Sequence, residues 1–83
     1  MTGDQVSAMA KSLAHYLELV GTFSGNASVI AAAAALETLA ANAAECALIA
    51  AGATTAVAAF QKIMDWLRGQ GHTAGATALA STK

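Results

Sequence analysis

The chain has 83 residues, of which 57% are hydrophobic and only 11% charged, and its formal net charge is −1. This length gives a single domain near the lower limit of what folds alone. The four basic residues are scattered, so the basic footprint of a nucleic-acid-binding protein is absent. Cys46 is the single cysteine, which excludes an intrachain disulfide and a cysteine cluster for zinc.

Alanine dominates the hydrophobic content, because 24 of the 83 residues are alanine. Without these alanines and Cys46, 22 large apolar side chains are left to build a core. The core is therefore thin, and the low charge leaves little material for an ordinary solvated surface. Low net charge and apolar exposure both favour association, so we expect self-association or incorporation in a larger assembly.

The first predicted helix covers residues 2–20. Thr2 and Gln5 have the spacing of a capping box, and Gly21 and Gly25 predict the exit after Val20. Apolar residues recur at steps of three and four, which predicts an inward face of Val6, Met9, Ala10, Leu13, Tyr16, Leu17 and Val20. The polar side carries Ser7, Lys11, His15, Glu18 and Thr22.

The second predicted helix runs without interruption over residues 28–51, with Asn26 or Ser28 as its cap and Gly52 at its end. At 1.5 Å per residue it would be about 35 Å long. Its alanine face allows close packing against other helices, and its ends are apolar nearly all round. We expect it to be the central or intersubunit element of the fold.

The third predicted helix covers residues 55–69, capped by Thr54 or Thr55 and ended by Gly69 and Gly71. Residues 72–83 are small and polar around Leu79, a composition typical of a tail. If the tail is ordered, we expect a neighbouring subunit to anchor it. The sequence therefore predicts an all-α, three-helix antiparallel bundle over residues 1–71 with a tail over 72–83, completed by oligomerisation.

No pattern of residues indicates a catalytic, cofactor-binding or metal site. His15 and Glu18 are three apart, but the order is reversed from the Glu-x-x-His of di-iron bundles and the pair lies off the apolar stripe. His72 lies among glycines with no base motif around it, and Gly69, Gly71 and Gly75 lack the strand and lysine of a phosphate loop. Cys46 lies on an apolar face, which favours a buried thiol. We therefore expect no enzyme and no cofactor.

Residues 19–36 and 46–61 are uncharged, which raises the interpretation that the chain is a membrane-active peptide resembling a holin. Polar residues interrupt both runs, alanine contributes little to insertion, and Glu37 and Glu45 lie in the most apolar helix. No basic region followed by an apolar one opens the chain, which predicts a cytoplasmic protein or one packed into a particle assembled there.

The sequence therefore favours a non-enzymatic structural subunit that self-associates or docks on a larger assembly, such as a component of a phage virion or a filament. A small inhibitor or adaptor that binds one host protein is the alternative. The residues expected to carry the contacts are Val29, Leu36, Leu39, Ala40, Ala43, Ile49, Phe60 and Trp66.

Overall fold

Five α-helices joined by short turns make up the computed structural model, which describes residues 1–81. They are α1 (Gly3–Ser24), α2 (Ala27–Ala41), α3 (Ala43–Ala51), α4 (Ala56–Gly69) and α5 (Thr73–Ala80). The all-α prediction is confirmed, and no strand occurs among residues 1–81. The number of helices is five rather than three, because residues 28–51 form two helices and residues 73–80 form another.

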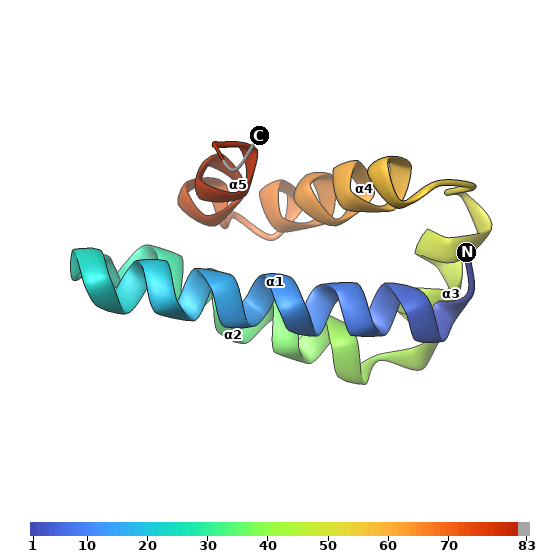
Figure 1. Cartoon of the computed structure of the whole chain (residues 1–83), viewed down its shortest axis with the longest axis horizontal. Helices are drawn as coiled ribbons and strands as arrows, with labels where there is room; N and C mark the ends of the chain where they lie inside the picture. Colours follow the sequence, from blue (N-terminus) through green and yellow to red (C-terminus); the bar gives the residue numbers. More distant parts are fainter. Residues whose placement is uncertain (82–83) are drawn as a thin grey trace.

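The helices form two layers that are closed at one end (Figure 1). α1 and α2 lie antiparallel and make the most extensive contact in the molecule. α4 and α5 form the second layer, in which α4 runs in nearly the same direction as α1. α3 turns away from α2 at the end where the N-terminus lies and leads the chain into α4. The whole measures 35 × 24 × 20 Å.

The capping box at the start of α1 is confirmed, but the helix ends later than predicted. The Thr2 N–H donates to Gln5 Oε1 at 2.8 Å, and the Gln5 N–H donates to Thr2 Oγ1 at 3.2 Å. α1 continues through Gly21, which is buried against the start of α2, where a Cβ would collide with Ile30. The helix instead stops at Gly25, whose φ of 66° is favourable for glycine. Gly21 is thus a close-packing residue, which is why it does not break the helix.

The predicted long helix breaks at Asn42, where α2 and α3 meet at 87°. The Asn42 side chain accepts from the Glu45 N–H at 3.1 Å and so caps α3. Two carbonyls at the broken end of α2 gain side-chain partners: the Ser7 hydroxyl donates to the Ala40 carbonyl at 2.6 Å, and the Cys46 thiol donates to the Leu39 carbonyl at 3.1 Å. Since the last carbonyls of a helix lack intrahelical partners, the bond from Ser7 of α1 and the bond from Cys46 of α3 both stabilise the break.

Residues 73–80 form helix α5, where the sequence predicted a tail. Gly71, at a φ of 84°, reverses the chain after α4, and the His72 N–H donates to the Leu67 carbonyl at 2.9 Å. α5 then packs mainly on α2 and α4 of its own chain and buries Gly75, Ala76 and Leu79. The expected anchor on a neighbouring subunit is therefore not needed for the described part of this segment; positions 82 and 83 lie outside the described residues.

The core lies between the two layers and is built half from small side chains. Its large members are Val6, Leu17, Val29, Leu36, Leu39, Ile49, Ile63, Met64, Leu67 and Leu79. Nine alanines and Cys46 complete it, and no polar or charged residue is buried among residues 1–81. Met9, Leu13, Val20, Phe60 and Trp66 pack against its edge.

Candidate functional site: an apolar surface on α1

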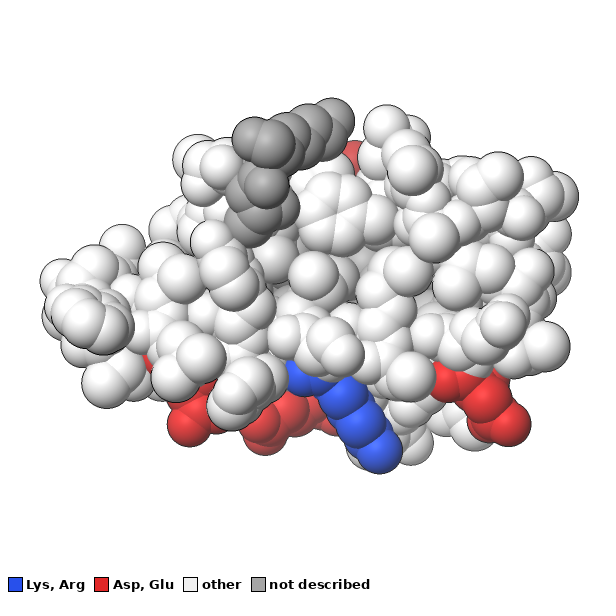
Figure 2. Space-filling model, viewed as in Figure 1, with Lys and Arg blue, Asp and Glu red and all other residues white. Residues whose placement is uncertain are grey.

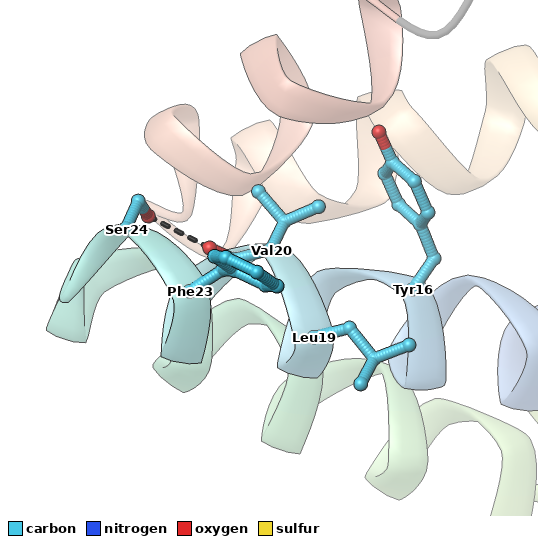
Figure 3. Close-up of a pocket in the computed structure, with 5 residues that line it drawn as sticks. All are labelled: Tyr16, Leu19, Val20, Phe23 and Ser24. Atoms are coloured by element: carbon cyan, nitrogen blue, oxygen red, sulfur yellow. Dashed lines mark hydrogen bonds between the residues drawn. The ribbon is translucent and has the colours of Figure 1, made fainter.

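The C-terminal half of α1 carries a shallow apolar hollow of about 430 Å³ on the outside of the molecule. Tyr16, Leu19, Val20, Phe23 and Ser24 line it, all from this one helix (Figure 3). The ring of Phe23 is 96% exposed, Leu19 is 55% exposed and Tyr16 is 39% exposed. In Figure 3, Tyr16 points toward the side on which α4 and α5 lie, whereas Leu19 points the opposite way.

The hollow offers almost nothing polar to a ligand. Ser24 is its one polar lining residue besides the Tyr16 hydroxyl, and the Ser24 hydroxyl already donates to the Val20 carbonyl at 2.7 Å (Figure 3). An exposed Phe and Leu side by side are unfavourable in water, because each leaves apolar surface hydrated that burial would remove. The chemistry of the hollow therefore suits an apolar protein surface far better than a polar substrate.

Charge is distributed unevenly around this surface. The face drawn in Figure 2 is almost free of Lys, Arg, Asp and Glu, which show mainly along its lower margin. On α1 the charged residues Asp4, Lys11 and Glu18 are seven positions apart and so follow one flank of the helix. The apolar hollow is thus bordered by charge on one side and is itself uncharged.

Most of the residues predicted to make intersubunit contacts lie in the core of their own chain. Val29, Leu36, Leu39, Ala40 and Ile49 are buried, with exposed fractions between 0% and 7%. Phe60 and Trp66 pack against the edge of the core and are half-buried. Ala43, the first residue of α3, is exposed. The structure gives the buried five an intramolecular role, and Ala43 is the one of the eight that is freely accessible on the single chain.

The side chains considered for metal binding lie in a depression on α1 and α2, and Cys46 lies in the core. Lys11, His15 and Glu18 of α1 line a surface depression with Glu37 of α2. Within residues 1–81 no group of three or more His, Cys, Asp and Glu side chains is placed to hold a metal ion. Cys46 is fully buried, and burial, followed by the nearby negative charge of Glu45, raises the pKa of its thiol. A thiol in this state is protonated and shielded, so it is a poor nucleophile.

The two uncharged runs that raised the membrane interpretation are each broken by a turn. Residues 19–36 cross the α1–α2 turn at Gly25, and residues 46–61 cross the turn between α3 and α4. In the described part of the chain, no helix taken alone has the length and hydropathy of a membrane span; α2 and α3 reach both only as a pair, bent by 87°.

Leu19 and Phe23 are the surface residues that the sequence analysis missed. The predicted end of the helix at Val20 places Phe23 outside the helix, and the apolar spacing predicts a single inward face that includes Tyr16. Tyr16 is instead exposed, so its predicted place on the inward face is wrong. The signal was nevertheless present, because Ser12, Tyr16, Leu19 and Phe23 follow one another at steps of four, three and four. That spacing is the mark of a second stripe on a helix whose first stripe already faces the core.

The chain matches no protein-family model, no curated protein and no solved structure.

Proposed function

We propose that this chain is a non-enzymatic assembly subunit that associates with copies of itself or docks on a larger protein assembly. The observation that supports the proposal most is the uncharged hollow on α1, which the exposed Phe23 helps to line. A subunit that works by contact needs an apolar surface of this kind and no reacting groups.

The division of the large apolar side chains supports the same proposal. Six of the 22 are exposed on the single chain, namely Tyr16, Leu19, Phe23, Ile30, Leu48 and Val57. An 83-residue chain that leaves more than a quarter of these side chains in water forgoes stability that its small core cannot easily replace. Contact with a neighbour would recover it, since anything that binds the folded state alone stabilises that state.

The setting that fits best is a phage virion or a filament assembled in the cytoplasm, where each subunit gains stability from its neighbours. A small adaptor or inhibitor that binds one foreign protein is the second candidate. It draws on the same hollow, whose five lining residues on one helix suit the side chains of a partner helix. A membrane-active peptide is the third and least favoured candidate.

The three candidates differ in what the solution mass will be. We would measure it by light scattering after size exclusion, without detergent, over a hundredfold range of protein concentration. A discrete or concentration-dependent multiple of 8.2 kDa supports the assembly subunit. A monomer at every concentration contradicts self-association and favours the adaptor, and material that dissolves only in detergent favours the membrane.

Ala43 offers an additional test of the contact residues expected from the sequence. The substitution Ala43→Glu places an exposed carboxylate in the first turn of α3, where the helix dipole favours it, so the fold should hold. A changed mass distribution would assign Ala43 to an interface, and an unchanged one would remove it. Ala40→Glu does not serve this purpose, because Ala40 is 6% exposed and a buried charge would unfold the chain.

A further inference from the structure

Helix α1 carries two uncharged stripes on opposite sides. Its core stripe consists of Val6, Ala10, Ala14, Leu17 and Gly21, all buried. Its outward ridge, which we define as Ser12, Tyr16, Leu19 and Phe23, is exposed at every position. At 100° per residue, Leu19 lies about 160° around the helix from Leu17, so the ridge faces away from the core. Packing within the described chain covers the core stripe and leaves the ridge in water.

The ridge is self-complementary when two copies run in opposite directions. Its steps of four, three and four read the same from either end, with a midpoint between Tyr16 and Leu19. An antiparallel second copy therefore places Tyr16 opposite Leu19 and the small Ser12 opposite the large ring of Phe23. Each of these pairs occurs twice, because the two copies are related by symmetry. Large against small is the alternation that closely packed helix interfaces require.

From this geometry we infer that the ridge packs antiparallel on the same ridge of a second copy, about a two-fold axis between residues 16 and 19. The inference rests on the proposed self-association and specifies the surface, direction and register. The charge pattern agrees with it: Asp4, Lys11 and Glu18 follow one flank and stay at the solvated rim, so no charged group of α1 is buried. Association through the ridge should therefore persist at high salt.

The area available sets the strength of this contact. With about 200 Å² for each aromatic ring, the exposed parts of Phe23 and Tyr16 supply about 270 Å² per copy and about 540 Å² for the pair. A specific interface buries about 1,200–2,000 Å² in total, so Leu19, Val20 and the surrounding helix surface must supply the rest. The aromatic rings alone supply less than half of that area, so the contact is weaker than a standard interface and should dissociate on dilution through the micromolar range.

An interface of this symmetry has a consequence for assembly. A two-fold contact uses the same patch on both copies and is closed once it forms. The ridge therefore builds dimers and stops there. A larger particle or filament needs a second surface, and the exposed Leu48 of α3 and Val57 of α4 lie outside the ridge.

The first experiment compares Phe23→Lys with Leu48→Lys as a matched control. Both positions are exposed and lie in the last turn of a helix that has no basic residue there, so lysine favours the helix in each case. Circular dichroism should show an unchanged fold for both variants. By sedimentation equilibrium, we expect Phe23→Lys to raise the dimer dissociation constant at least tenfold and Leu48→Lys to leave it within a factor of two.

The second experiment measures direction with one spin label per chain at Asp4→Cys or Lys11→Cys, which lie on the same flank. Cys46 is fully buried and stays unlabelled in the native protein. In an antiparallel pair, each label lies about 1.5 Å along its helix for every residue between it and the two-fold axis. The two labels are therefore separated along the helices by about 41 Å at position 4 and by about 20 Å at position 11. Parallel copies give nearly equal distances at the two positions.

The outcomes separate this inference from the proposed function. A wild-type chain that is monomeric at every concentration overturns this inference and the self-association in the proposed function, and leaves docking on a larger assembly or on one partner protein standing. A wild-type chain that associates while Phe23→Lys associates equally well overturns the ridge and leaves self-association standing. Equal label distances overturn the antiparallel register alone. Monomers that bind phosphatidylcholine and phosphatidylserine vesicles through Phe23 would assign the ridge to a membrane and refute the second copy.

Discussion

Gly75 of α5 lies directly against Ala32 of α2, and replacing it by alanine should weaken the fold. A Cβ built on Gly75 overlaps the methyl group of Ala32, with a methyl of Leu17 at 3.5 Å beside it. Neither alanine methyl can rotate away, so one helix must move. The substitution also has a favourable effect, because alanine is about 1 kcal/mol better than glycine inside a helix.

The balance of these two effects gives the expected magnitude. Overpacking a core position costs about 1–3 kcal/mol, and a contact between two rigid methyl groups belongs in the upper half of that range. After subtraction of the helix propensity, Gly75→Ala should lower the free energy of unfolding by about 1–2 kcal/mol. For a domain of this size, that is a fall in Tm of roughly 4–16 °C.

Urea denaturation followed by circular dichroism would measure the effect against Gly69→Ala. Gly69 is also helical, but an added Cβ there meets nothing within 4 Å, so this control should be neutral or slightly stabilising. In a double-mutant cycle, Ala32→Gly should recover part of the loss in the Gly75→Ala background, because it removes the opposing methyl. If Gly75→Ala were as stable as the wild type, or the cycle showed no coupling, the close packing of α5 on α2 would be refuted.

Three further predictions follow from the core and the helix break. Leu79→Ala should lower stability by about 2–5 kcal/mol, since Leu79 is fully buried, whereas a frayed tail would tolerate the change in urea denaturation. Asn42→Ala should cost about 1 kcal/mol by removing the cap on the Glu45 N–H, and amide exchange should then quicken first at the start of α3; unchanged exchange there would contradict the capping role. The Cys46 thiol has a raised pKa in the folded chain, so its contribution to stability is present below the pKa of the unfolded thiol and is lost as pH rises toward the folded value. Alkylation at pH 8 should accordingly be slow in the native protein and fast in urea, and equal rates would show that the thiol is accessible.

Local signals in the sequence were reliable where the structure itself depends on local contacts. The capping box of Thr2 and Gln5 is confirmed, and of the two caps predicted for each of the next helices the structure has Asn26 rather than Ser28 and Thr55 rather than Thr54. Each of these caps is a bond between residues two or three positions apart. The wrong boundaries, by contrast, lie at residues whose role depends on another helix. Gly21 could be recognised as a close-packing residue only once Ile30 was placed against it.

The surface on α1 shows the same limit. Spacing alone places Tyr16, Leu19 and Phe23 on one side of a helix, but it does not say which of two uncharged stripes faces the core. That choice depends on α2, whose alanine face accepts the smaller side chains of the stripe at Ala10, Ala14 and Gly21 and leaves the bulky one outside.

By itself, the sequence determined that the chain is helical, where three of its helices start to within about two residues, and that it lacks large side chains for a deep core. Alanine-rich composition and capping residues act over a few positions, so they work the same way in any surroundings. Only the tertiary structure decided that the apolar run breaks at Asn42, where Ser7 and Cys46 supply the bonds that a broken helix needs, and that residues 73–80 form a helix. α5 has little intrinsic stability at eight residues, and it exists because Gly75 lets it lie directly on the alanines of α2.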